Sequence, residues 1–294
     1  MVTPLRERDT LDVAGLERLI EHLIDGGVSG LFILGTTGEG PLLSYRLRRE
    51  LIERTCAQVK QRVAVLACVS DAAFAESLAL AKHAADCGAD AIVAAPPFYL
   101  PFAQAELQDY YATLVKESPL PLFLYNFPAL TKTRIEVETL RHALDHPRIV
   151  GIKDSSGDLG NFHAIVATTR TRPDWTLLCG PDELLAETVA AGGHGGVNAG
   201  ANVFPKLYVA CARAALAGET QRASQLQADV LRVTSSLYRV STSAAAITQG
   251  VKSALSLLGI CDDAMTEPFR RLTGEQRRAI QTSLDELEAF ADVS

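Results

Sequence analysis

Residues 148–158 read RIVGIKDSSGD, an apolar strand pattern that ends on a lysine. Ile149, Val150 and Ile152 place apolar side chains on both faces of a strand, which is typical of strands buried in a parallel sheet. Lys153 follows at once. A solvated lysine just past a strand is the common case, whereas a lysine whose amine is desolvated inside a barrel is a nucleophile. The rest of the chain has to decide between these two interpretations.

Bulk composition excludes several classes of protein. The apolar fraction of the 294 residues is 48%, which suffices for a core and is too high for a disordered chain. The formal net charge of −7 and the pI near 5.4 argue against a nucleic-acid binder, which normally carries a basic face. No window approaches the roughly 18 apolar residues of a membrane span, and the N-terminus lacks the apolar stretch of a secretory signal. We therefore expect a cytoplasmic protein without nucleic-acid or membrane partners.

The cysteines show no C-x-x-C pairing. In a chain of this length they are typical of reduced, mostly buried residues rather than metal ligands. The six positions are Cys56, Cys68, Cys87, Cys179, Cys211 and Cys261.

Seven short apolar runs alternate with longer amphipathic segments. These runs are the expected strands, at 31–35, 63–69, 91–95, 120–126, 148–154, 176–180 and 195–200. The segments between them have the 3.6-residue period of surface helices with one buried face, as in SYRLRRELIERTCAQV, which begins at a plausible N-cap, Ser44. Residues 1–3 could add a stub of an eighth strand before Pro4.

Strand and helix alternating without a break in composition indicate βα units and a parallel sheet. Eight such units close into a (β/α)8 TIM barrel of about 200–250 residues. A doubly wound open sheet is the rival, but no G-x-G-x-x-G follows the early strand. From about residue 220 the pattern predicts only three helices. We therefore expect a barrel at 1–219 and a C-terminal helical extension, packed on the barrel, at 220–294.

In such a barrel the active site lies at the C-terminal ends of the strands. The side chains found there include a lysine, two tyrosines and two adjacent threonines, with no histidine and no metal-ligand cluster. The positions are Thr36, Thr37 and Glu39, then Tyr99, then Tyr125 and Asn126, then Lys153, and finally Asp182 and Glu183.

This set of residues suits Schiff-base chemistry. A neutral lysine amine attacks a ketone to give an imine, whose nitrogen can accept electrons from a neighbouring C–C or C–H bond. A tyrosine within hydrogen-bond reach can move the proton, and a threonine hydroxyl can hold the phenol. Paired threonines at a strand-to-helix turn also offer backbone N–H groups, which suit a carboxylate.

Four segments carry a resemblance to a known family: GTTGEGPLLS (35–44), YNFP (125–128), GIKDSSGD (151–158) and GGHGGVNAGANVFP (192–205). They resemble the signature segments of the N-acetylneuraminate lyase and dihydrodipicolinate synthase superfamily, over essentially the whole chain. The resemblance implies pyruvate-dependent class I aldolase chemistry on a (β/α)8 barrel, in a homotetramer built as a dimer of dimers. It implies no cofactor beyond a covalent imine with pyruvate, and no metal.

The resemblance also implies the roles of particular residues. Lys153 would form the Schiff base and Tyr125 would move the proton, with Thr36 and Tyr99 completing the relay. Tyr99 would reach a neighbouring subunit's site, and Thr37 would bind the pyruvoyl carboxylate with help from backbone amides. Further substrate-binding positions are Gly38, Leu130, Gly180, Asp182, Glu183, Val197 and Ala199.

Leu130 separates the branches of that superfamily. The synthase branch places an arginine two residues after YN-x-P, where it grips the second substrate's carboxylate; here YNFPALTK places Leu130 there. A leucine is similar to sialic acid lyases, as is the acidic pair of GPDE (180–183). Ala199 departs from the serine of those lyases and is closer to 2-keto-3-deoxygluconate aldolases.

We therefore expect an aldolase for 2-keto-3-deoxy sugar acids, of the 2-keto-3-deoxygluconate or N-acetylneuraminate type. The alternatives are a dihydrodipicolinate synthase, which condenses pyruvate with aspartate semialdehyde, and a non-catalytic metabolite-binding relative.

Other signals are weaker. His142 and His146 in HALDH lie four residues apart, but no glutamate follows the first histidine and Pro147 ends the helix, so surface histidines are expected. AGGHGG precedes a strand rather than a helix, which indicates a tight turn and not a phosphate loop. The resemblance implies a first strand that begins several residues before Val2. The start codon is therefore assigned late, or the barrel closes with a stub.

Overall fold

The computed structural model describes residues 1–293, and its contacts divide the chain into two compact units. The first unit joins Met1–Val65 to the stretch that begins at Asn198, and the second is Leu66–Val197. This division differs from the expected one between a barrel at 1–219 and an extension at 220–294, which stays a prediction.

One sheet contains seven strands in the order in which they occur along the chain, and all the pairings from β4 to β9 are parallel. The strands are β3 (Gly30–Ile33), β4 (Ala64–Cys68), β5 (Ala91–Ala94), β6 (Leu122–Asn126), β7 (Ile149–Asp154), β8 (Thr176–Cys179) and β9 (Gly195–Gly196). All seven expected strands are therefore present. The last is shorter than expected, with two residues in place of six.

The glycine inside β7 has a packing reason. A Cβ on Gly151 would lie 2.3 Å from the carbonyl oxygen of Thr176 in β8 and 2.5 Å from the ring of Phe123 in β6. Because a backbone carbonyl in a sheet cannot move aside cheaply, only glycine fits between these two strands. The apolar run of the opening segment is thus interrupted without leaving the sheet.

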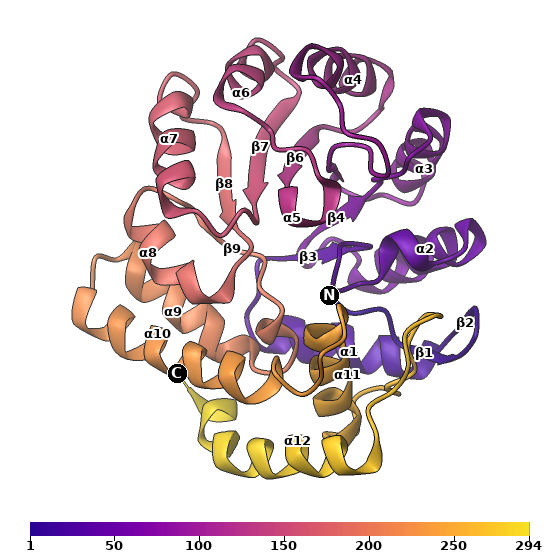
Figure 1. Cartoon of the computed structure of the whole chain (residues 1–294), viewed down its shortest axis with the longest axis vertical. Helices are drawn as coiled ribbons and strands as arrows, with labels where there is room; N and C mark the ends of the chain where they lie inside the picture. The colour runs from indigo at the N-terminus through magenta and orange to yellow at the C-terminus, as the bar shows by residue number, and fades with distance from the viewer. Residues whose placement is uncertain (294) are drawn as a thin grey trace. The chain divides into compact units, whose positions relative to one another are not determined.

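In the second unit a helical segment follows each strand from β4 to β8. Figure 1 shows α3, α4, α6 and α7 outside the strands β5–β8, so the strands are covered on that face. The helical segments are α3 (Phe74–Asp86), α4 (Gln104–Glu117), α5 (Pro128–Thr131), α6 (Val137–Leu144), α7 (Leu159–Thr169), η2 (Asp182–Leu184) and α8 (Leu185–Ala190). Asp158 begins α7 as its N-cap, because its side chain accepts from the amide of Asn161 at 3.0 Å.

The N-terminal part of the first unit contains an antiparallel hairpin that the sequence did not suggest. Its strands are β1 (Leu5–Glu7) and β2 (Thr10–Leu11), followed by α1 (Val13–Asp25), η1 (Gly40–Leu42) and α2 (Tyr45–Val59). The strand stub suggested at residues 1–3 is not formed. Hydrogen bonds rather than a strand ladder hold the N-terminal residues. The Met1 ammonium donates to Phe32 O at 2.7 Å, and the Val2 amide donates to Asn202 Oδ1 at 2.9 Å.

Four helices and two short helical turns complete the described part of the first unit. They are η3 (Gly200–Asn202), α9 (Pro205–Leu216), α10 (Thr220–Leu237), α11 (Ala246–Leu257), α12 (Gly274–Leu287) and η4 (Glu288–Asp292). The three helices expected after residue 220 correspond to α10, α11 and α12. Thr273 begins α12 with a capping box, since its side chain and that of Gln276 each accept from the other's backbone amide.

The six cysteines are free thiols, and four of them are buried, as expected for small apolar residues of a reduced protein. Among the helices of residues 1–293, none combines the length and the apolar character that a membrane span requires.

Candidate active site

Lys153 and Tyr125 lie side by side on neighbouring strands. The parallel register pairs Tyr125 of β6 with Lys153 of β7, each in the last two residues of its strand. Only 7% of Lys153 and 4% of Tyr125 are exposed. The lysine Nζ lies 4.4 Å from the centroid of the tyrosine ring. Lys153 is therefore enclosed by protein, and its amine faces an aromatic ring. It is not a solvated lysine just past a strand.

A buried polar network lies one residue further along the same two strands. Asn126 is paired with Asp154 in the register, and its Nδ2 donates to Asp154 Oδ1 at 2.7 Å. Asp154 also accepts from Ser156 Oγ at 2.7 Å and from Asn161 Nδ2 at 3.3 Å. Asn126 Oδ1 in turn accepts from the amide of Ile135 at 3.0 Å. Because successive residues of a strand point to opposite faces, this network fixes the register of the two strands from the face opposite to Tyr125 and Lys153.

Burial raises the pKa of the Asp154 carboxyl above its ordinary value of 3.8, and the hydrogen bonds from Ser156, Asn126 and Asn161 oppose this rise. The sequence pattern places Asn126 at a strand end and Asp154 directly after Lys153, but predicts no role for either residue. Both are almost fully buried, at 0% and 3% exposure. Their position directly after Tyr125 and Lys153 is the signal that could have identified them.

Backbone contacts extend the site toward β8 and β9. The amide of Gly180 donates to Asp154 O, and the amide of Val197 donates to Cys179 O, both at 2.8 Å. A Cβ on Gly180 would lie 1.8 Å from Ser155 Oγ, so the close approach requires a glycine as these side chains stand. Burial raises the pKa of the Cys179 thiol to about 12, which excludes it as a nucleophile near neutral pH.

The predicted acidic pair is divided between the interior and the surface. Asp182 is 4% exposed at the start of η2, whereas Glu183 is exposed. The two carboxylates therefore have different surroundings.

Tyr99 and Leu130 are the exposed members of the predicted set. Tyr99 follows β5, is 93% exposed and has a φ of 91°, which is uncommon for a residue with a bulky side chain. Leu130 lies in the four-residue helix α5, and 53% of it is exposed. The described chain thus presents an aromatic and an apolar side chain to solvent at the ends of two neighbouring strands.

The remaining predicted residues belong to the first unit. Thr36, Thr37 and Gly38 form a turn after β3 that is closed by a hydrogen bond from the Glu39 amide to Thr36 O at 3.0 Å. Thr36 is exposed, Thr37 is half-buried, and Gly38 O accepts from the Thr3 hydroxyl at 2.6 Å. Ala199 begins η3 as its N-cap residue.

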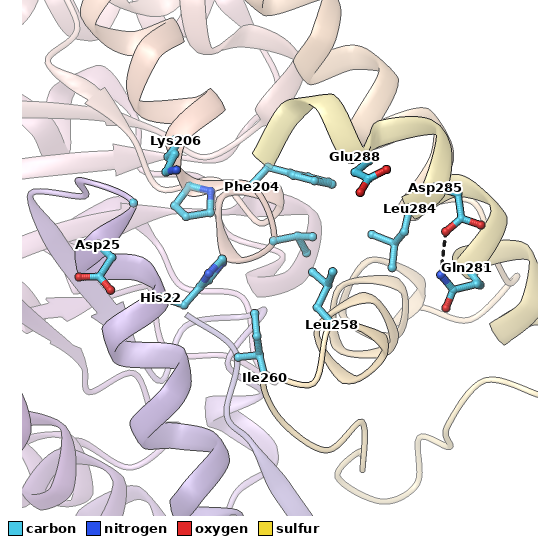
Figure 2. A pocket seen from close by; sticks show the side chains of 13 residues that line it. His22, Asp25, Phe204, Lys206, Leu258, Ile260, Gln281, Leu284, Asp285 and Glu288 are labelled. Atoms are coloured by element: carbon cyan, nitrogen blue, oxygen red, sulfur yellow. Dashed lines mark hydrogen bonds between the residues drawn. The ribbon is translucent and has the colours of Figure 1, made fainter. Parts of the chain in front are cut away.

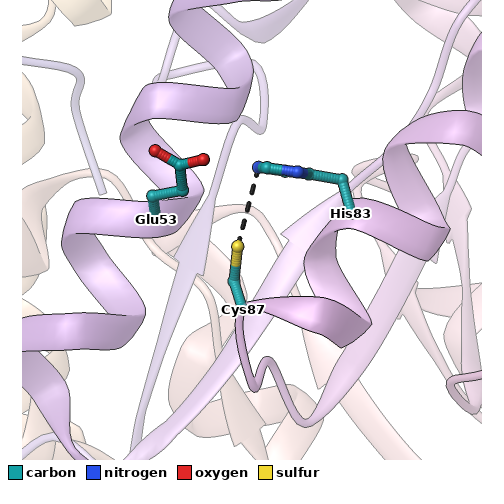
Figure 3. Close-up of side chains that lie close together, drawn as sticks. All are labelled: Glu53, His83 and Cys87. Carbon is teal, nitrogen blue, oxygen red and sulfur yellow. Dashed lines mark hydrogen bonds between the residues drawn. The ribbon is translucent and has the colours of Figure 1, made fainter.

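Two other groups of side chains contain none of the predicted site residues. A pocket of about 620 Å³ in the first unit is lined by His22, Asp25, Phe204, Lys206, Leu284, Glu288 and neighbouring residues, none of them predicted site residues (Figure 2). At the end of α3, Cys87 Sγ lies 3.6 Å from His83 Nε2 (Figure 3). His142 is exposed and its ring centroid lies 5.3 Å from that of half-buried His146, so the surface position expected for this pair agrees with the structure.

The chain is similar in sequence to known enzymes over most of its length. The family model described as the dihydrodipicolinate synthetase family matches residues 1–287. The probable 2-dehydro-3-deoxy-D-pentonate aldolase YjhH of Escherichia coli (strain K12) is 38% identical over 226 residues, which cover 76% of this chain and 75% of that protein. Fold and relatives together define a carbon–carbon lyase of the class I aldolase type. The chain belongs to the dihydrodipicolinate synthetase family.

Two solved structures support the same fold. Dihydrodipicolinate synthase from Bacteroides thetaiotaomicron has a TM-score of 0.94 and 45% identity, and the match covers 97% of this chain and 96% of that one. YagE, a prophage protein of the dihydrodipicolinic acid synthase family from E. coli K12 solved with pyruvate, has a TM-score of 0.91 and 30% identity over 98% of this chain and 96% of its own. The predicted fold class, an α/β TIM barrel with C-terminal helices, is confirmed. In the described residues its sheet has seven strands rather than the expected eight.

Proposed function

We propose that this protein is a pyruvate-dependent class I aldolase that cleaves or forms a 2-keto-3-deoxy sugar acid, with Lys153 as the imine-forming residue. The observation that carries the proposal is the buried amine of Lys153, 4.4 Å from the Tyr125 ring on the neighbouring strand. Membership of a family of lyases and synthases supports the reaction class. The complex of YagE with pyruvate supports the choice of keto acid.

In the proposed reaction the neutral Lys153 amine attacks the C2 ketone, and water leaves to give the imine. In the cleavage direction, electrons of the C3–C4 bond move into this imine, so an aldehyde is released and an enamine remains. Tyr125 takes the proton from the C4 hydroxyl, and protonation and hydrolysis of the enamine release pyruvate. Thr36 and Tyr99 would complete the proton relay, with Tyr99 supplied by a neighbouring copy in a homotetramer, while Thr37 and the Gly38 amide would bind the carboxylate.

Leu130 supports a sugar acid as substrate. A half-exposed leucine provides no positive charge for a second carboxylate, and the aldolase YjhH is 38% identical. Gly180, Asp182, Glu183, Val197 and Ala199 would then meet the polyol chain. A second candidate is a dihydrodipicolinate synthase, which the 45% identity to the Bacteroides thetaiotaomicron synthase favours.

Two measurements test the proposal. Pyruvate with borohydride should add an irreversible mass at Lys153, found by peptide mass spectrometry. Lys116→Met, which replaces an exposed lysine of α4, serves as the control for labelling elsewhere. An unlabelled protein, or a label on another lysine, would end the Schiff-base assignment. A panel of aldehydes condensed with pyruvate should then show sugar-derived aldehydes ahead of aspartate semialdehyde, and the reverse order would favour the synthase.

A further inference from the structure

The first unit contains a buried ion pair between Lys252 in α11 and Glu39 in the turn after β3. Lys252 is 0% exposed and Glu39 is 4% exposed. A charged pair is costly to bury unless its remaining hydrogen-bonding groups are also satisfied. The groups that hydrogen-bond to Glu39 and Lys252 therefore indicate the role of this ion pair.

Both oxygens of the Glu39 carboxylate are occupied. Oε2 accepts from the Thr266 amide at 2.8 Å and from the Thr266 hydroxyl at 2.7 Å, while Oε1 pairs with Lys252 Nζ. The lysine also donates to Ala264 O at 2.7 Å. Helix α11 and Thr266 thus each bind one oxygen of the Glu39 carboxylate.

The backbone that this glutamate belongs to is strained. Leu34 and Glu39 both have a positive φ, 62° and 57°, although neither is a glycine. A Cβ on Gly40 would lie 1.9 Å from Leu34 O, so only glycine fits at position 40. Such a backbone persists only when its surroundings determine it strongly. The Glu39 side chain provides that restraint at the C-terminal end of the Thr36–Gly38 turn.

We infer that Glu39 and Lys252 are positioning residues for substrate carboxylate binding, because they fix the turn whose threonines and amides meet the carboxylate. This inference rests on the proposed function, which assigns the carboxylate to that turn. Stability alone does not explain the pair, since a well-packed apolar replacement for a buried ion pair is often neutral or stabilising. Helix α11 would thereby contribute to substrate binding indirectly, through the turn that Glu39 restrains.

The test uses the double variant Glu39→Gln/Lys252→Met, which leaves no unpaired charge. Borohydride trapping at Lys153 is measured against the concentration of pyruvate and, separately, of hydroxyacetone, a ketone without a carboxylate. The half-saturating concentration of pyruvate should rise about tenfold or more, the usual loss for a hydrogen bond to a charged group, while that of hydroxyacetone stays within about twofold. A merely structural role would move both values or neither.

Gln249→Leu is the matched control. Gln249 is also a buried polar residue of α11, and it donates to Arg270 O at 2.7 Å without contacting Glu39. It should leave the ratio of the two half-saturating concentrations unchanged. If the double variant does not fold, Thr266→Val should raise the pyruvate value by a smaller factor. An unchanged ratio in a folded variant overturns this inference alone, whereas a wild-type protein that forms no pyruvate adduct overturns the proposed function as well.

Discussion

Replacing Asp154 by alanine should destabilise the protein strongly, because three side-chain donors lose their acceptor at once. Asn126 is 0% exposed, so its Nδ2 would be left without its 2.7 Å partner and without water, at about 1–3 kcal/mol. Ser156 and Asn161 are half-buried and can turn toward water, so each loses about 0.5–1.5 kcal/mol. Relief of the carboxylate's burial, which the raised pKa of Asp154 reflects, offsets part of this loss. We expect a net loss of about 2–4 kcal/mol.

The assay is urea unfolding of wild type, Asp154→Ala and Ser156→Ala, with the free energy of unfolding compared at constant slope. Ser156→Ala removes one of the three bonds and leaves the Asn126 contact intact, so its loss should be about 0.5–1.5 kcal/mol. Equal losses in the two variants would show that the buried Asn126–Asp154 contact contributes nothing, and would refute the argument.

Three further predictions concern catalysis, specificity and pH. Tyr125→Phe should still trap pyruvate at Lys153 but lose about 10²–10⁴-fold in kcat, and near-normal turnover would assign proton transfer to another group. Leu130→Arg should raise kcat/KM for aspartate semialdehyde, by a factor that corresponds to about 1.5–3 kcal/mol of added transition-state stabilisation, and should lower kcat/KM for sugar acids. A wild-type protein that is already efficient with the semialdehyde and inactive with sugar acids would contradict this prediction. The Arg62 guanidinium and Gln58 lower the pKa of Glu21 from 4.5 to about 2, so Arg62→Gln should raise that pKa in an NMR titration. Because this pKa is lowered on folding, the pair's stabilisation is present above pH 4.5 and is lost as the pH falls toward about 2; an unmoved Glu21 titration in the variant would exclude Arg62 as its cause.

The sheet could be predicted because its strands are apolar on both faces and follow one another in chain order. The exceptions have local causes. In β9 only two glycines, Gly195 and Gly196, form the ladder, so the expected length had no apolar pattern behind it. The hairpin β1–β2 is built from LRE and TL, in which polar side chains face solvent and only Leu5 and Leu11 are buried.

The positions of Lys153 and Tyr125 near strand ends could also be predicted, because the end of a strand can be recognised in the sequence, whereas their catalytic roles stay predictions. Lys153 and Tyr125 were found in this way, and the structure places them side by side. The contact between Asn126 and Asp154 could not be predicted, because it depends on the register of two strands. The pairing of Glu39 with Lys252 lies further out of reach, since it joins a turn near one end of the sequence to a helix near the other.

The exposure of Leu130 has a consequence for how such enzymes change in evolution. Substitutions of half-exposed side chains on a short helix usually alter stability by less than about 0.5 kcal/mol, so this position can drift without a penalty on folding. Lys153, Tyr125 and Asp154 have no such freedom, since each is nearly fully buried. Under the proposed function, a lineage could therefore change its aldehyde partner at position 130 without a large change in stability, while the buried Lys153 and Tyr125 stay in place.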